Sequence, residues 1–263
     1  MTLKITILGC GHSAGVPSIG NFWGQCDPEE PRNRRTRPSI AVQSANTNLI
    51  VDTGPDFKAQ INATDITRID AVLYTHGHGD HVHGIDDLRV MRIRNKAVIP
   101  VYSNQATIEE LHERFGYLFA ESGSDGIYPQ VIDPHIWSKS HFNQSHIVGD
   151  IDVVPFEQSH GEDGISLGFR MGNFAYSTDM TDLSQESLEV LAGVDTWVVD
   201  AGGYKMPHNY VHATLRDVYA LNEIVQARQV YLTHMPSYMD YRTMLAELSE
   251  GYAPAYDGMV IEV

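Results

Sequence analysis

Three histidines and one aspartate fall within six consecutive residues, in the segment His76–His81, which reads H-G-H-G-D-H. Neutral imidazoles and a carboxylate are suitable ligands for Zn²⁺ and for neighbouring divalent metals. The two glycines permit a tight backbone, so that the side chains between them can converge on one point. Because the segment directly follows a short apolar run, it predicts a metal site rather than a solvated polar loop.

Further ligands are expected from other parts of the chain, because these four residues cannot complete two metal sites. Three candidates follow apolar runs: His160 after V-V-P-F-E-Q-S, Asp179 after F-A-Y-S-T, and His234 after V-Y-L-T. Each one alone is equally well explained as a surface histidine or as an aspartate that caps a helix. Their repetition at the ends of predicted strands favours a shared site.

Together with the turn that begins at Asp52, these residues resemble the metallo-β-lactamase superfamily, in the family's order and over essentially the whole chain. The resemblance implies two divalent metal ions, Zn²⁺ or Mn²⁺, with Fe also open. In it, Asp179 bridges two ligand groups: His76, His78 and His160 for one ion, and Asp80, His81 and His234 for the other. Asp52 would lie behind the ligands and orient their loop; its alternative is a plain turn residue.

A finer resemblance rests on longer segments in loops. The segments G-x-G-x-S-x-G-V-P (9–17), P-R-N-R-R-T-R (31–37), P-H (207–208), H-A-T-L (212–215) and A-Y-D-G (255–258) are similar to one branch of the superfamily. That branch contains the phosphoribosyl cyclic phosphodiesterases and is related to the tRNA 3′-end-processing endonucleases. Its members typically carry a cysteine cluster that holds a structural zinc. Here only Cys26 stands in that stretch, so no separate structural zinc is expected.

The branch implies hydrolysis of a small cyclic or nucleotide-like phosphate ester by a hydroxide that the two metals activate. Asp80 and His212 are the candidate catalytic residues, with His212 as the general acid. His208 is a candidate to contact phosphate or to hold His212, and Ser13 and Arg35 are candidates for substrate binding. The alternatives are a histidine at a helix start for residue 212, and a solvated loop with ion pairs for the basic run 32–37.

Composition narrows the remaining classes of function. The 263 residues contain 18 Lys and Arg against 34 Asp and Glu, a net charge of −16, which argues against a stable nucleic-acid complex. No run of eighteen apolar residues is present, so no membrane span is expected. Two cysteines and the lack of a basic, apolar leader favour the cytoplasm. A homodimer is left open, because no interface is readable.

The elements that must position these residues alternate along the chain. Strands are predicted over 3–8, 39–44, 48–51, 71–74, 98–102, 151–156, 166–171, 174–177, 196–200, 229–233 and 259–263, and helices over 56–64, 85–94, 107–119, 183–191, 214–226 and 241–248. No linker or repeat divides them, so residues 1–263 are interpreted as one α/β domain. Two mixed sheets covered by helices, a four-layer αββα sandwich, is the expected fold.

Two other classes of function stay open beside the phosphodiesterase. One is a superfamily hydrolase of a thioester or another carboxylic substrate; the Gly-Val-Pro and Arg-rich segments favour phosphate instead. The other is a non-catalytic protein that binds metal or ligand. A tRNA-processing role is less favoured, because the sequence shows no long insertion rich in glycine and basic residues and the net charge is acidic.

Overall fold

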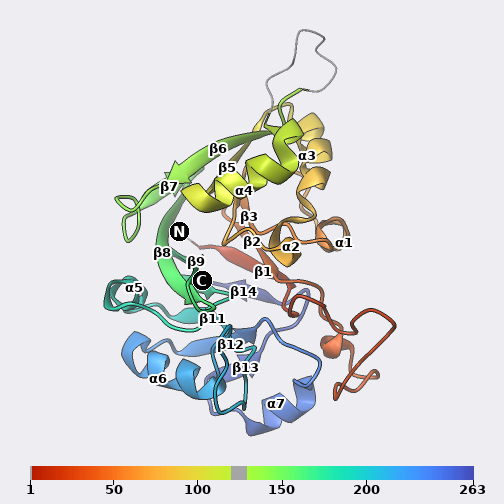
Figure 1. Ribbon diagram of the computed structural model, residues 1–263, viewed down its shortest axis with the longest axis vertical. Helices are drawn as coiled ribbons and strands as arrows, with labels where there is room; N and C mark the ends of the chain where they lie inside the picture. Colours follow the sequence, from red (N-terminus) through yellow and green to blue (C-terminus); the bar gives the residue numbers. More distant parts are fainter. Residues whose placement is uncertain (1, 120–128) are drawn as a thin grey trace.

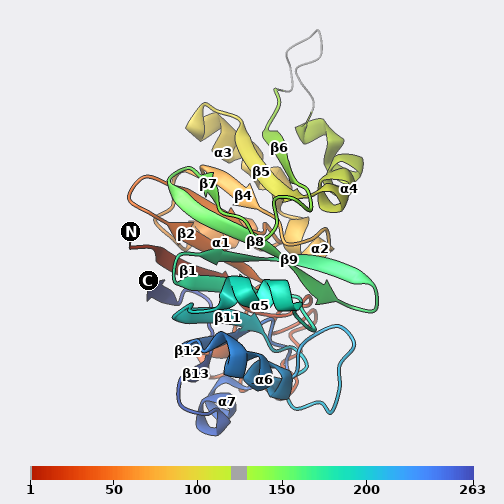
Figure 2. The same ribbon diagram turned by 90° about the vertical axis from the view of Figure 1, so that its left-hand side faces the viewer.

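The computed structural model describes residues 2–119 and 129–263. Within them, two mixed β-sheets pack face to face, and helices cover the outer side of each sheet. Helices α1 to α4 lie beyond the first sheet and helices α5 to α7 beyond the second (Figures 1 and 2). The predicted αββα sandwich is therefore the observed fold.

The first sheet combines the N-terminal strands with the last strand of the chain. Its order is β14-β1-β2-β3-β4-β5-β6. The strands are β1 (Lys4–Gly9), β2 (Ser39–Gln43), β3 (Asn48–Val51), β4 (Ala71–Leu73), β5 (Ile99–Asn104), β6 (Ile132–Trp137) and β14 (Val260–Glu262). Residues alternate between the two faces, as strand geometry requires: Ile5 and Ile7 face the second sheet, whereas Leu8 packs beneath the helices.

The second sheet has the order β13-β12-β11-β10-β9-β8-β7. Its strands are β7 (His146–Val148), β8 (Ile151–His160), β9 (Gly164–Met171), β10 (Phe174–Ser177), β11 (Thr196–Asp200), β12 (Gln229–Thr233) and β13 (Tyr252–Pro254). Strands β10, β11 and β12 are parallel, and β8 runs the same way because β9 is antiparallel to both β8 and β10. Their carboxyl ends therefore meet at one edge of the sheet.

Short helices connect and cover the strands. They are α1 (Phe57–Asn62), α2 (Gly79–Val82), α3 (Leu88–Asn95), α4 (Gln105–Phe115), α5 (Gln185–Leu191), α6 (Leu215–Val225) and α7 (Tyr241–Glu247). Side-chain caps fix several starts: Asn104 begins α4, and Thr214 with Asp217 forms a capping box at α6. In residues 2–119 and 129–263, no helix has both the length and the apolar character that a bilayer crossing requires.

Candidate metal centre

The H-G-H-G-D-H segment leaves the carboxyl end of β4 and enters α2. His76 and His78 lie in the loop, and Asp80 and His81 lie in the short helix itself. The loop is tied down at its start, because the N–H of Thr75 donates a hydrogen bond to Oδ1 of Asp52 over 2.9 Å. Four predicted ligands therefore come from one edge of the first sheet.

The second sheet supplies the other three predicted ligands from the carboxyl ends of its strands. His160 is the last residue of β8, Asp179 follows β10 by two residues, and His234 directly follows β12. Asp179 and His234 adopt the left-handed conformation, with φ of 51° and 57°. Such φ values are uncommon for residues other than glycine. Here they turn the backbone sharply at the strand ends, which brings both side chains to the site.

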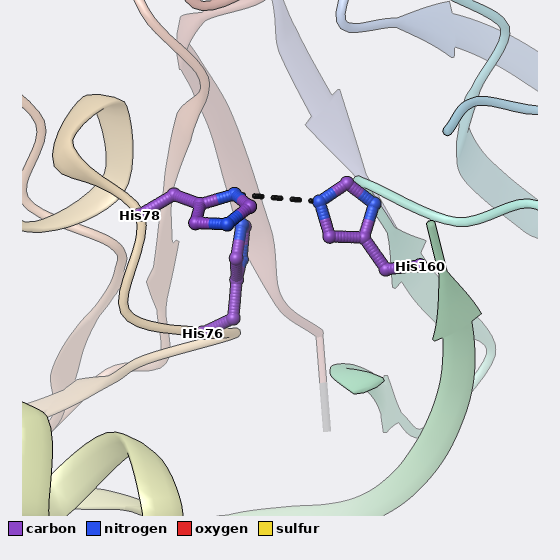
Figure 3. Close-up of side chains that lie close together, drawn as sticks. All are labelled: His76, His78 and His160. Atoms are coloured by element: carbon purple, nitrogen blue, oxygen red, sulfur yellow. Dashed lines mark hydrogen bonds between the residues drawn. The ribbon is translucent and has the colours of Figure 1, made fainter. Parts of the chain in front are cut away.

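The structure brings all seven predicted ligands together in two adjacent groups. The first group is His76, His78 and His160, which Figure 3 shows with their imidazoles turned toward one another. The second group is Asp80, His81, Asp179 and His234. Within each group, one ligand atom from every residue lies within 4.8 Å of the others. In the first group, Nδ1 of His78 and Nε2 of His160 are 3.4 Å apart.

The Asp179 carboxylate lies between the two groups. Its Oδ2 is 3.0 Å from Nε2 of His81, and its Oδ1 is 3.3 Å from Nε2 of His234. The same Oδ1 is 3.7 Å from Nε2 of His160, which belongs to the first group. This is the position that a residue shared by both groups must take.

Three of the histidines are held by the nitrogen that faces away from the site. Nδ1 of His76 contacts Thr75 Oγ1 at 3.0 Å, and Nδ1 of His160 lies 3.1 Å from the carbonyl of Val211. Nδ1 of His81 is 2.7 Å from Oδ2 of Asp52. Fixing one ring nitrogen sets the tautomer and leaves Nε2 to face the centre, as in metal-binding histidines.

The inward nitrogens fit a bound cation. Nε2 of His76 and both ring nitrogens of His234 are buried and have no hydrogen-bond partner among the described residues. Burial also lowers the pKa of His76, which keeps its imidazole neutral, and a metal ligand must be neutral. Buried polar atoms without partners are destabilising unless something satisfies them. Both groups are therefore compatible with a divalent metal site.

Asp52 lies behind the candidate ligands, in the position that the resemblance implies for it. It is fully buried, and its φ of 63° is again left-handed. Besides the backbone of Thr75, the carboxylate accepts a hydrogen bond from Thr75 Oγ1 at 2.8 Å. With its contact to His81, it joins two points of the ligand loop through a single side chain.

His212 lies at the edge of the ligand groups, and its ring stacks on that of His234 with 4.5 Å between centroids. The structure adds a residue that the sequence did not single out, Asp200 at the end of β11. Nδ1 of His212 is 2.8 Å from Oδ2 of Asp200, so Asp200 rather than His208 holds this ring. Burial disfavours the charged imidazole, but the Asp200 carboxylate outweighs it and raises the pKa of His212 to about 9.

His12 is a second residue that the sequence did not single out. It is half-buried, and its backbone N–H donates to the carbonyl of Met235, the residue after His234. Burial, with the neighbouring His234 and His212, lowers the pKa of His12 to about 4. The only signal for His12 in the sequence is its place inside the Gly-rich segment 9–17, in which the predicted contact residue is Ser13, and Ser13 is exposed.

The other candidates for substrate contact lie outside the two groups. His208 is exposed and packs against the ring of Tyr210. Arg35 is 2% exposed, and its Nη2 donates to Asn33 Oδ1 at 3.1 Å. The remaining arginines of the basic run are used locally: Arg32 over the rings of Tyr241 and Tyr256, Arg34 over Trp23, and Arg37 paired with Asp56 at 3.1 Å.

Comparison with known proteins agrees with this geometry. A beta-lactamase superfamily domain matches residues 47–235, which contain all seven candidate ligands. Among solved structures, a diphosphatase from the PhnP family is 32% identical and has a TM-score of 0.87, covering 100% of this chain and 98% of its own.

Two curated relatives match over part of their length. An octanoyltransferase from Porphyromonas gingivalis (strain ATCC BAA-308 / W83) is 31% identical over 207 residues, which are 78% of this chain and 40% of the relative. A ribonuclease Z from Bradyrhizobium sp. (strain ORS 278) is 36% identical over 83 residues, 30% of this chain and 28% of the relative. This chain thus spans well under half the length of each. From the family match over residues 47–235 and the shared fold, the chain belongs to the beta-lactamase superfamily.

Proposed function

We propose that this protein is a phosphodiesterase that works with two divalent ions, Zn²⁺ or Mn²⁺, on a small cyclic or nucleotide-like phosphate ester. The observation that carries the proposal is the Asp179 carboxylate, which lies 3.0 Å from His81 and 3.7 Å from His160, in contact with both ligand groups. His76, His78 and His160 would hold one ion, and Asp80, His81 and His234 the other, with Asp179 shared.

A pair of divalent ions, when bound, lowers the pKa of water and polarises phosphoryl oxygens. The chain itself supplies the proton for the leaving group. His212 is protonated at neutral pH, because its pKa is raised to about 9, and Asp200 holds Nδ1 so that Nε2 is free to donate. A positioned acid of this kind accelerates proton transfer by about 10²–10⁴-fold.

The similarity to a diphosphatase and to a ribonuclease Z supports phosphate over other electrophiles. A second candidate function is hydrolysis of a carboxylic substrate such as a thioester. The match to an octanoyltransferase over 207 residues supports this second candidate. The same metal groups would polarise an acyl carbonyl, so the substrate rather than the metal chemistry separates the two.

The test is hydrolysis of bis(p-nitrophenyl) phosphate by purified protein loaded with Zn²⁺ or Mn²⁺, beside an octanoyl thioester, with metal counted by mass spectrometry. We expect turnover of the phosphate diester that rises with loading up to two ions per chain. Asp179→Ala should lower metal content and abolish turnover, whereas Asp182→Ala, an exposed neighbour, should do neither. Turnover of the thioester alone would favour the second candidate, and metal binding without any turnover would favour a non-catalytic protein.

A further inference from the structure

A cavity of about 530 Å³ opens directly beside His76, His78 and His160. Ligand cavities in proteins typically have about 300–1,000 Å³, so this one has room for much more than a phosphoryl group. Its walls are the start of α4, the segment that follows β6, and the hairpin between β8 and β9. His76, Gly77 and His78 of the H-G-H-G-D-H segment line the side of the cavity next to the metal centre.

One part of the cavity wall is aromatic and apolar. Trp137 ends β6 and is 4% exposed, with its ring packed against those of Tyr102 and Phe169 at centroid distances of 5.2 and 6.0 Å. Phe142 is half-buried beside it, and Ile165 of the hairpin is 49% exposed. Because Trp137 is almost fully buried, the accessible apolar surface of this part of the wall is that of Phe142 and Ile165, on which a flat group can pack.

Another part of the cavity wall carries carboxylates. Glu157 is half-buried and Asp163 is exposed, and in the described part of the chain neither side chain forms an ion pair or a hydrogen bond. Glu110 also lines the cavity but is already paired with Arg114 at 3.0 Å. Among the described residues that line the cavity, Lys139 is the one lysine or arginine, and its flexible side chain is exposed.

These two features select for one kind of group. An ionised carboxylate only accepts hydrogen bonds, so a ligand beside Glu157 and Asp163 must bring N–H or O–H donors. A second phosphate brings only negative charge and acceptors. An aromatic heterocycle with an exocyclic amino group offers both a flat face for Phe142 and N–H donors for the carboxylates, as cytosine does to Asp or Glu in nucleic-acid recognition.

We propose that this cavity binds the amino-bearing base of a nucleotide substrate whose phosphate lies at the metal centre. The proposal deepens the phosphodiesterase function and rests on it for the placement of the phosphate. Stacking of a base on an aromatic side chain raises affinity by about 5- to 150-fold, and each exposed charge–dipole contact raises it less. Affinity is therefore set mainly by Phe142, and the choice among bases by Glu157 and Asp163.

The test is calorimetric binding to Zn²⁺-loaded protein, which needs no turnover. Cytidine 5′-monophosphate and ribose 5-phosphate share phosphate and sugar, so the ratio of their dissociation constants measures the contribution of the base. We expect cytidine 5′-monophosphate to bind at least tenfold more tightly. Phe142→Ala should reduce the ratio of the two dissociation constants by about tenfold. Tyr117→Ala removes an aromatic ring that is 53% exposed and does not line the cavity, so it should leave this ratio unchanged.

A second ligand pair tests the carboxylates. Uridine 5′-monophosphate replaces the amino group of cytidine with an oxygen, and we expect it to bind about two- to fivefold more weakly. Asp163→Asn with Glu157→Gln should remove this preference while leaving the affinity for ribose 5-phosphate unchanged. Equal binding of all three ligands to the wild-type protein overturns the proposal, as does a base preference that survives Phe142→Ala and both amide substitutions.

Hydrolysis of methyl p-nitrophenyl phosphate, which has no base, separates this proposal from the function on which it rests. Turnover of that ester with no base-dependent binding would keep the phosphodiesterase and reject the base cavity. Base-dependent binding that is lost in Phe142→Ala, with no turnover of any phosphate diester, would keep the cavity and reject the phosphodiesterase.

Discussion

Half-buried His212 and fully buried Asp200 form a pair in which Nδ1 of the imidazole donates to Oδ2 of the carboxylate over 2.8 Å. Asp200 is itself fixed by the backbone, because the N–H groups of Met180 and Gly202 donate to it over 3.0 and 2.7 Å. One carboxylate therefore sets both the orientation of the ring and its charge.

We predict that Asp200→Asn lowers activity and moves its pH profile. Without the carboxylate charge, the pKa of His212 falls from about 9 toward its ordinary value near 6.5. Activity that needs the protonated imidazole disappears as pH rises through this pKa, so the alkaline limb of kcat/KM should move to lower pH. The profile is measured at saturating metal with a phosphate diester of an alkyl alcohol, because this poor leaving group needs the acid.

The matched variant is His212→Gln, which should remove the alkaline limb altogether while metal content stays unchanged. It should also slow esters of alkyl alcohols, with poor leaving groups, by about 10²–10⁴-fold and nitrophenyl esters far less. Equal losses on both kinds of ester would contradict the role of His212 as the acid.

Asp52→Asn should weaken metal binding without unfolding the protein. Asparagine tolerates the left-handed backbone at this position, but its amide presents an N–H₂ group where His81 or Thr75 now finds an acceptor. Loss of such a contact behind a ligand lowers metal affinity by about 10–100-fold. Competition with a chelator measures this, and Asp56→Asn, on the same turn but without a ligand contact, serves as the control.

Gly54→Ala should displace the ligand loop. A Cβ at this position would lie 2.1 Å from the backbone carbonyl of Asp80, and backbone cannot move aside cheaply. We expect metal content to fall and activity to drop at least tenfold, about 1.4 kcal/mol or more. Gly116→Ala, where nothing lies within 4 Å of the added carbon, should leave metal content and activity unchanged. Full metal retention in Gly54→Ala would contradict the close approach.

Asp257 should make stability depend on pH. Its carboxylate accepts hydrogen bonds from the N–H groups of Cys10 and Thr36 over 3.0 and 2.7 Å, yet burial outweighs them and raises its pKa to about 6. The folded state then holds this proton more tightly than the unfolded state. The free energy of unfolding should therefore fall by between about 1 and 3 kcal/mol as pH rises from 4 to 6.

The measurement is urea unfolding of wild-type protein and Asp257→Asn across that range, at matched metal content. The variant should be less stable overall, because its amide cannot accept from both sets of donors. Its free energy of unfolding should nevertheless lack the fall between pH 4 and 6 that the titration of Asp257 causes in the wild-type protein. Parallel pH profiles of the two proteins would show that Asp257 does not titrate there.

The candidate ligands could be predicted from the sequence because each is a chemically unusual residue at a recognisable strand end. Asp200 is the last residue of the predicted strand 196–200, but a single aspartate at a strand end looks like any residue that starts a turn or helix. His12 gave no separate signal inside a loop rich in glycine. Its proximity to His234 depends on a backbone contact between residues 12 and 235, and no local pattern encodes that contact.

The strands that escaped prediction are edge strands or lie beside an edge. β6 reads I-D-P-H-I-W, with a proline in its middle and four exposed residues, and β7 and β13 have three residues each. An edge strand has one side without a neighbouring strand, so it tolerates proline and exposed polar residues. Such strands therefore lack the apolar alternation that marks a central strand. The sequence predicts β8 only as far as Phe156, because the last residues of this strand are polar, show no apolar pattern and pair with β9 in a hairpin.

The division of the ligands between the two sheets has a consequence for how the protein is made. The segment His76–His81 is synthesised long before His234. Neither ligand group is complete without a residue from the second sheet. The first group can be completed once His160 of β8 has been made, whereas the second cannot be completed before His234, which follows β12. The two groups are therefore completed at different stages of translation, the first earlier than the second.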